Sequence, residues 1–79
     1  MGRKEELLTL LTKSVWTTQD ILVYDNTLNS RQSATNVKTR AVNEFNGAVP
    51  YGKKFVLADS VLALYGTTRE REIERLKKM

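Results

Sequence analysis

The stretch that decides the fold is residues 16–47, which read WTTQDILVYDNTLNSRQSATNVKTRAVNEFNG. It opens on two helix-start signals. Thr17 and Asp20 have the spacing of a capping box, in which each side chain accepts a hydrogen bond from the other residue's backbone N–H. Trp16 and Ile21 flank that box at the spacing of a hydrophobic staple. Together they predict a short helix that begins just after Thr17 and buries one apolar face.

A turn and a second helix should follow. The first helix is expected to end at Tyr24, because Asp25-Asn26-Thr27 is rich in turn-forming residues. The second is expected from Arg31 to Phe45, since its apolar residues recur every three or four positions. Those residues are Ala34, Val37, Ala41 and Phe45. Its predicted end signals are Asn29 or Ser30 as the N-cap and Asn46-Gly47 at the C-terminus.

The remaining surface of this second helix is unusually polar. It includes nearly every side-chain type that hydrogen-bonds phosphates or base edges, and Glu44 is its only acid. An ordinary solvated helix face would carry more Glu and more paired charges. If the helix binds DNA, the residues expected to face bases are Arg31, Gln32, Thr35, Asn36 and Thr39. Those expected to contact the DNA backbone are Lys38, Arg40 and Asn43.

The net charge of +4 lies entirely within residues 31–54. That segment holds five basic residues against one acidic residue, whereas the rest of the chain holds eight of each. A local excess in an otherwise balanced chain indicates a patch for a polyanion. The plainer interpretation, a chance run of solvated lysines, stays open because the sample is small.

Residues 48–57 are expected to form a small β-hairpin with a basic tip. Two short apolar runs flank Gly52, which can adopt the positive φ of a tight turn. Pro50 cannot donate to a sheet ladder, so it suits an edge strand. The expected DNA-contacting residues of this wing are Tyr51, Lys53 and Lys54. Tyr51 could instead cover the edge of the core.

The motif Trp16-Thr17-Thr18-Gln19-Asp20-Ile21 resembles the opening of the excisionase and MerR-type winged-helix families. In those families an aromatic residue and a Thr-Thr or Ser-Thr pair precede Gln/Glu-Glu/Asp-Ile/Ala. Val49–Tyr65 is similar to their wing and following helix. The chain departs from their pattern at Asp25–Asn29, where they usually have Gly-Val/Ile-Ser. The likeness covers a core of residues 15–66 and implies a mainly α winged helix-turn-helix, with a small β-hairpin and flanking N- and C-terminal helices.

The resemblance implies a sequence-specific double-stranded DNA-binding protein without catalytic activity. The expected role is that of an excisionase, a recombination directionality factor of a phage or mobile element. Such proteins bind and bend attachment-site DNA, often with copies side by side, to direct an integrase. A small phage or plasmid transcriptional regulator is the first alternative, and a protein-interaction adaptor is the second. RNA binding is less favoured, since the chain lacks the aromatic-rich strands of RNA-recognition sheets.

Composition limits the chemistry and the architecture. Seventy-nine residues predict a single domain, 1–79, whose charged helical tail is residues 67–79. The chain has no Cys and no His, so a thiol nucleophile, a histidine base and a zinc site are excluded. We therefore expect no enzyme, metal, cofactor or small-molecule substrate. The apolar run at 7–11 is too short to cross a membrane, which favours a cytoplasmic protein with no membrane partner.

Three further helices are expected outside the quoted stretch. Glu5–Lys13 has the apolar spacing of a helix that packs on the core. Asp59 and Thr67 are the predicted N-caps of the last two helices, with Glu70 completing a capping box with Thr67. The apolar stripe of the tail, Ile73, Leu76 and Met79, is expected to pack on the first helix, with self-association as the minority interpretation.

Overall fold

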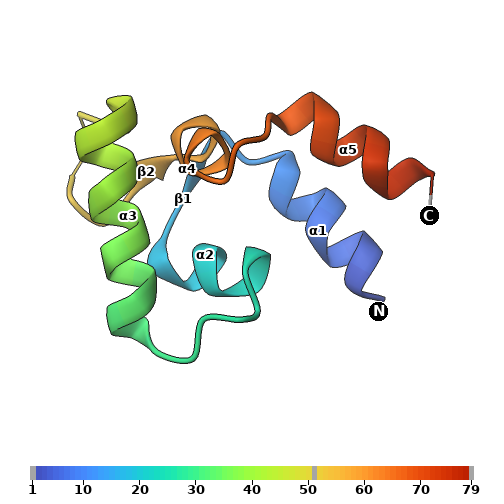
Figure 1. Ribbon diagram of the computed structural model, residues 1–79, viewed down its shortest axis with the longest axis horizontal. Coiled ribbons are helices and arrows are strands. Elements are labelled where there is room, and N and C mark those ends of the chain that lie inside the picture. Colours follow the sequence, from blue (N-terminus) through green and yellow to red (C-terminus); the bar gives the residue numbers. More distant parts are fainter. Residues whose placement is uncertain (1, 51, 79) are drawn as a thin grey trace.

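The computed structural model describes residues 2–50 and 52–78 and shows a mainly helical chain with a small antiparallel sheet (Figure 1). The predicted wing residue Tyr51 and the tail residue Met79 lie outside the described residues. In chain order the elements are α1 (Arg3–Leu11), β1 (Val15–Trp16), α2 (Thr18–Tyr24), α3 (Arg31–Phe45), β2 (Val56–Leu57), α4 (Ala58–Leu64) and α5 (Arg69–Lys77).

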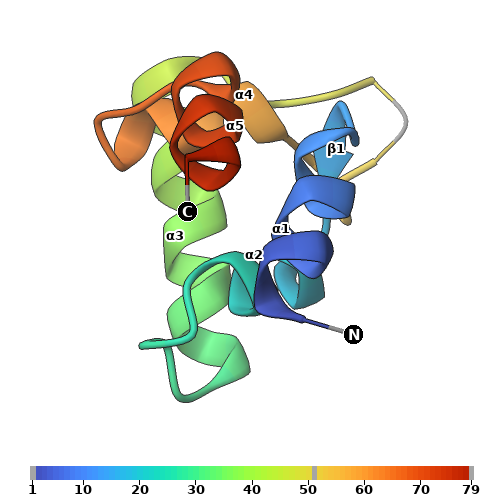
Figure 2. The same cartoon turned by 90° about the vertical axis from the view of Figure 1, so that its right-hand side faces the viewer.

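Helix α3 forms one side of the molecule, and α2 and α4 pack against its inner face (Figure 1). Helices α1 and α5 contact each other on the opposite side, and Figure 2 looks onto that side. The outer face of α3 is therefore left to solvent. None of the described helices is both long and apolar enough to cross a membrane.

The core is centred on Trp16, whose side chain is 0% exposed. Its indole N–H donates to the carbonyl of Leu10 at 3.0 Å, and its ring centroid lies 5.3 Å from that of Tyr24. In the sheet Trp16 pairs with Val56. The other buried apolar residues are Leu7, Leu10, Leu11, Ile21, Ala34, Ala41, Val56, Ala58, Val61, Leu62 and Leu76. A single indole thus contacts elements from both halves of the chain.

The bounds of α2 and α3 predicted within residues 16–47, and the cap at Thr17, are confirmed. Thr17 caps α2, accepting from the Asp20 N–H at 3.3 Å, while the Asp20 carboxylate accepts from the Thr17 N–H at 3.0 Å. Helix α3 has the predicted bounds, and of its two candidate caps Ser30 is the one used, accepting from the Ser33 N–H at 3.2 Å. Asn46 ends α3 in the left-handed conformation, with φ of 54°.

The predicted β-hairpin at residues 48–57 is wrong. Among the described residues of that segment only Val56 and Leu57 form a strand, and its partner is Val15–Trp16 rather than residues 48–50. Pro50 lacks the N–H that a ladder needs, and burial of Trp16 brings β1 against β2 instead. The segment is closed at its base by the Leu57 N–H, which donates to the Gly47 carbonyl at 2.9 Å.

Two predicted helix caps are also wrong. Helix α4 follows β2 without a break and has no side-chain cap, so Asp59 lies inside its first turn and pairs with Arg69 at 3.3 Å. Thr68 rather than Thr67 caps α5. The N–H of Thr67 donates to the Leu62 carbonyl and completes the end of α4, which removes Thr67 from the cap position. The element that precedes each helix therefore decides where the helix starts.

The apolar stripe of the tail packs as predicted where the structure describes it. Leu76 is buried, Ile73 packs against the core, and α5 lies along α1. Phe45, by contrast, was expected on the buried face of α3 but is 41% exposed. The chain turns away at Asn46, so the last turn of α3 extends beyond the core that covers Ala34 and Ala41.

Gly47 marks a close approach between the end of α3 and α4. A Cβ at this position would lie 2.9 Å from Ser60 Cβ and 2.9 Å from a methyl group of Val56. Ser60 cannot move freely, because its hydroxyl donates to the Phe45 carbonyl at 3.0 Å. Only a residue without a side chain fits between them.

Gly47→Ala should lower the free energy of unfolding by about 1–3 kcal/mol, the usual cost of overpacking a well-packed site. Urea titration measures it. Gly2→Ala is the matched control, because a Cβ at Gly2 meets no atom within 4 Å. Equal urea midpoints for the two variants would contradict the close approach.

Candidate nucleic-acid interface

The outer face of α3 carries a stripe of uncharged polar side chains. The stripe residues are Gln32, Asn36, Thr39 and Asn43, all exposed. Their spacing of four, three and four residues places them on one face of a helix. The Gln32 amide donates to the Asn36 amide oxygen at 3.1 Å, which orients both groups along the stripe. Such amides can read base edges or bind other polar surfaces.

The other predicted α3 residues flank this stripe. Arg31 is exposed at the N-terminal end, and Thr35 and Lys38 are half-buried on the side of the 46–55 loop. Arg40 is exposed on the other side, where its guanidinium pairs with Glu44 at 3.0 Å. A surface ion pair of this kind is worth about 0–1 kcal/mol, so it offers little resistance to a competing phosphate.

The basic residues near α3 keep most of their charge uncompensated. Among the described residues, Arg31, Lys53 and Lys54 have no carboxylate within 4.0 Å, and all three are exposed. Several cations elsewhere are paired, as in Lys13 with Asp20 at 3.3 Å and Arg75 with Glu72 at 3.2 Å. The charge excess predicted from the sequence therefore persists at the surface of the folded chain.

A groove of about 640 Å³ lies between α3 and the 46–55 loop. Its walls are Thr35, Lys38, Thr39, Val42, Asn43, Ala48, Val49, Pro50, Gly52, Lys53 and Phe55. Figure 2 shows this loop, in yellow, extending outward from the end of α3. Polar residues of α3 and one basic residue of the loop, Lys53, thus border one groove.

The sequence pattern did not predict the apolar part of this groove. Val42 lies off the buried stripe of α3, and Ala48, Val49, Pro50 and Phe55 were assigned to the strands of a hairpin. The sequence feature that could have indicated the groove is this run of apolar residues, which no partner strand covers among the described residues. Because that run is a loop, its side chains line a groove.

Lys38 occupies a special place in the groove. Its ammonium donates to the main-chain carbonyl of Lys53 at 2.7 Å, a short bond across the groove from helix to loop. Lys38, which was predicted to contact phosphate, is therefore bonded in the free protein to Lys53, which was predicted to lie in the wing.

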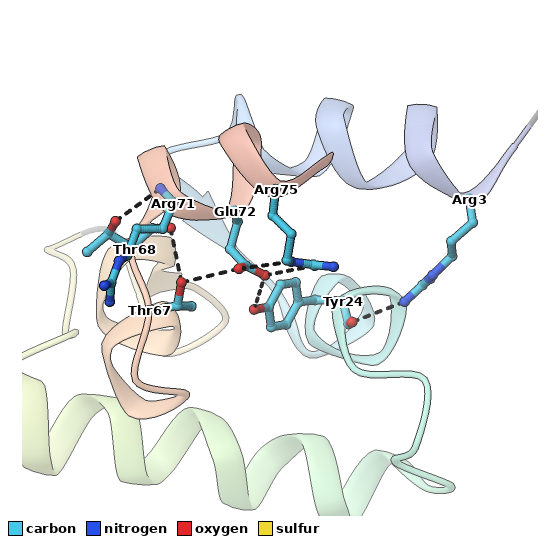
Figure 3. A network of polar contacts seen from close by, with 7 residues as sticks. All are labelled: Arg3, Tyr24, Thr67, Thr68, Arg71, Glu72 and Arg75. Atoms are coloured by element: carbon cyan, nitrogen blue, oxygen red, sulfur yellow. Dashed lines mark hydrogen bonds and ion pairs between the residues drawn. The ribbon is translucent and has the colours of Figure 1, made fainter. Parts of the chain in front are cut away.

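Behind α2 and α3, a polar network joins α2 to the C-terminal helix (Figure 3). The Glu72 carboxylate accepts from the Tyr24 hydroxyl at 2.9 Å, from Thr67 at 3.2 Å and from the Arg75 guanidinium at 3.2 Å. Arg3 of α1 donates to the Tyr24 carbonyl at 3.1 Å. The network fixes the end of α2 against α1 and α5, on the side away from the outer face of α3.

A second polar contact lies at the start of the turn that leads from α2 to α3. The Tyr65 hydroxyl donates to the Asp25 carboxylate at 2.5 Å, and the other oxygen of Asp25 accepts from the Thr27 N–H at 3.0 Å. The rings of Tyr24 and Tyr65 meet edge to face at 5.3 Å. The turn between α2 and α3 is thereby tied to the end of α4.

These contacts shift the pKa values of their members. Burial raises the pKa of the Tyr24 hydroxyl far above its ordinary value, and its hydrogen bond to Glu72 acts in the same direction. Burial alone would raise the pKa of the Glu72 carboxyl, but the hydrogen bonds from Arg75 and Tyr24 outweigh it and lower the pKa. Asp25 follows the same pattern, with bonds from Thr27 and Tyr65.

The lowered pKa of Glu72 predicts acid sensitivity. A carboxyl whose folded pKa is depressed stabilises the fold above its unfolded pKa of about 4.3 and loses that contribution as pH falls through the folded value. Glu72→Gln should therefore be less stable at pH 7 and should lose less stability between pH 7 and pH 3. Part of the loss of stability at low pH should remain in this variant, because the pKa of Asp25 is also lowered in the folded chain.

Thermal unfolding at several pH values measures this dependence, with Glu70→Gln on the exposed side of α5 as the control. If Glu72→Gln keeps the full acid loss of the parent chain, Glu72 does not supply the titrating contact.

Comparison with protein-family models, with curated proteins and with solved structures gives no match for this chain. Among residues 2–50 and 52–78, no three acidic side chains are placed to hold a metal ion together. Any assignment of function has to be argued from the chain's own surface.

Proposed function

We propose that this protein binds double-stranded DNA sequence-specifically, with α3 in the major groove and the 46–55 loop against the backbone, in the manner of a winged helix-turn-helix protein. One observation carries the proposal. The uncharged polar stripe of α3 lies beside exposed cations that no described carboxylate neutralises. Phosphate contacts supply affinity and base-edge contacts supply discrimination, so DNA binding needs both kinds of surface together.

The dimensions of α3 support this arrangement. A helix with its side chains is about 10–12 Å wide, and the major groove of B-DNA is about 12 Å wide. The fifteen residues of α3 span about 22 Å at the helical rise of 1.5 Å per residue. Its outer face is free of the other helices, which pack on its inner face or lie on the far side of the molecule (Figure 1).

In this proposal the two parts of the surface have different roles. Gln32 and Asn36 contact base edges near the N-terminal end of α3, where Arg31 also lies, and Thr35 and Thr39 follow along the helix. Amide side chains can bond adenine through two hydrogen bonds, and arginine can do the same with guanine. Lys53 and Lys54 contact phosphates, with Arg40 and Asn43 as further backbone contacts.

The narrower proposal is an excisionase that bends attachment-site DNA and directs an integrase. It is supported by the resemblance of residues 16–21 to the excisionase and MerR-type families, whereas the wing hairpin implied by the likeness of residues 49–65 is not formed among the described residues. Helices α1 and α5 lie on the side of the molecule away from α3 (Figure 2). When α3 is on the DNA, the α1 and α5 side is left for an integrase or a neighbouring copy. Circular-permutation mobility shifts test it: a strong bend favours the excisionase, and straight DNA favours a transcriptional regulator.

A protein-interaction adaptor is the second candidate, and the apolar walls of the groove favour it. Val42, Val49, Pro50 and Phe55 offer contact area of the kind that binds a peptide. DNA remains the better-supported ligand, since the rim of the same groove is basic and the stripe beside it lacks aromatic anchors. Fluorescence anisotropy with random duplex DNA separates the two, because an adaptor would give no salt-dependent binding.

Lys53→Ala combined with Lys54→Ala should weaken binding to every duplex and lower the slope of log K against log salt by about two units, since each lost phosphate contact removes about 0.9. Mobility-shift titrations over a salt series measure it. Arg71→Ala combined with Lys77→Ala removes the same charge from α5 and should change the slope much less. An unchanged slope in the loop variant would refute the backbone contact.

Asn36→Ala should act differently, by reducing the ratio of specific to random-duplex affinity about tenfold, the cost of one lost base contact. Competition titrations with a selected site and a scrambled duplex measure the ratio. If the ratio is unchanged while affinity falls for both, α3 contacts the backbone rather than the bases.

A further inference from the structure

Lys38 lies where α3 faces the 46–55 loop, and its side chain crosses the groove. The ammonium lies 2.7 Å from the Lys53 carbonyl oxygen, and the side chain is half-buried between the groove walls. Arg31, Lys53 and Lys54 differ from it, because their side chains are exposed. Of these cations near the groove, Lys38 alone has its charged group on the protein's own main chain.

This bond fixes the loop at a second point. The base of the loop is closed by the Leu57 N–H on the Gly47 carbonyl, at 2.9 Å. The Lys38 bond holds the opposite end, at Lys53, although no sheet ladder supports the segment. Gly52, at φ of 131°, precedes the held residue and gives the chain a conformation that other residues rarely adopt.

The charge of the donor strengthens the bond. An ammonium has three donors, and a bond from a charged donor to a carbonyl is stronger than a neutral one. The bond itself is exposed to solvent, with a short length of 2.7 Å. Because the carbonyl belongs to Lys53 itself, the bond sets the distance from α3 to the two exposed lysines at the tip.

We propose that Lys38 is a positioning residue of the DNA interface, which acts by holding the loop so that Lys53 and Lys54 reach the backbone while α3 reads the bases. This inference rests on the proposed function and revises the role expected for Lys38, a direct phosphate contact. Holding the loop in place before binding removes an ordering cost that DNA would otherwise have to supply.

The loop constraint can be tested in the free protein. Lys38→Met keeps the apolar stem and removes the donor, so tryptic cleavage after Lys53 and Lys54 should accelerate about three- to tenfold, the factor expected from one lost hydrogen bond. Arg40→Met is the matched control, since Arg40 pairs with Glu44 on α3 and not with the loop. Lys38→Arg retains a donor and should restore slower cleavage. Equal cleavage rates for Lys38→Met and the parent, both folded by circular dichroism, would overturn the constraint.

A double-mutant cycle on DNA separates positioning from direct contact. Lys38→Met in the parent chain should weaken binding and lower the salt slope. In the background that carries Lys53→Ala and Lys54→Ala, the same change should have almost no further effect, because the lysines it positions are gone. A further slope loss of about 0.9 in that background would show a direct phosphate contact and overturn the proposal.

The two arms also distinguish this inference from the proposed function. If the parent chain binds no duplex DNA, the proposed function fails and the positioning role fails with it. The proteolysis result still decides whether Lys38 constrains the loop.

Discussion

The structure depends on the burial of one indole. Trp16 is excluded from water, and an indole N–H in that position needs an acceptor. The acceptor is the Leu10 carbonyl in the last turn of α1, which also accepts from the Lys13 N–H at 3.1 Å. Trp16 also directly precedes Thr17, the N-cap of α2, and pairs with Val56 in β2. The directions in which α1, α2 and β2 leave the core are therefore set by one side chain.

Tyr24 extends that constraint to the C-terminal half. Its ring lies against Trp16 on one side and Tyr65 on another, while its hydroxyl reaches the Glu72 carboxylate. Helix α5 is thereby held beside α1, on the side of the molecule away from α3 (Figure 3). This placement matters for function, because a C-terminal helix docked on the outer face of α3 would cover the polar stripe. The packing that stabilises the small fold also leaves its most unusual surface free.

The sequence predicted what adjacent residues determine. The capping box at Thr17, the extent of α3 and the left-handed end at Asn46 all depend on side chains a few positions apart, and all three are found. The hairpin failed because the partner of Val56 is Trp16, about forty residues earlier, and no local pattern identifies that pairing. The Tyr24–Glu72 bond and the Lys38–Lys53 bond are invisible for the same reason. The apolar groove followed directly from the missed pairing, since residues assigned to a strand form a loop wall instead.

The distribution of charge links the fold to the proposed interface. Acidic residues that serve the fold, such as Asp20 in the cap, Asp25 in the turn and Glu72 in the network, are engaged in contacts away from the outer face of α3. The uncompensated cations gather beside that face, where mutual repulsion lowers stability slightly. A positive potential along one flank of a helix attracts a polyanion from a distance but cannot distinguish sequences. In the proposed DNA interface, discrimination comes from the neutral amides between the charges, and for that reason the proposal treats the stripe and the loop as one surface.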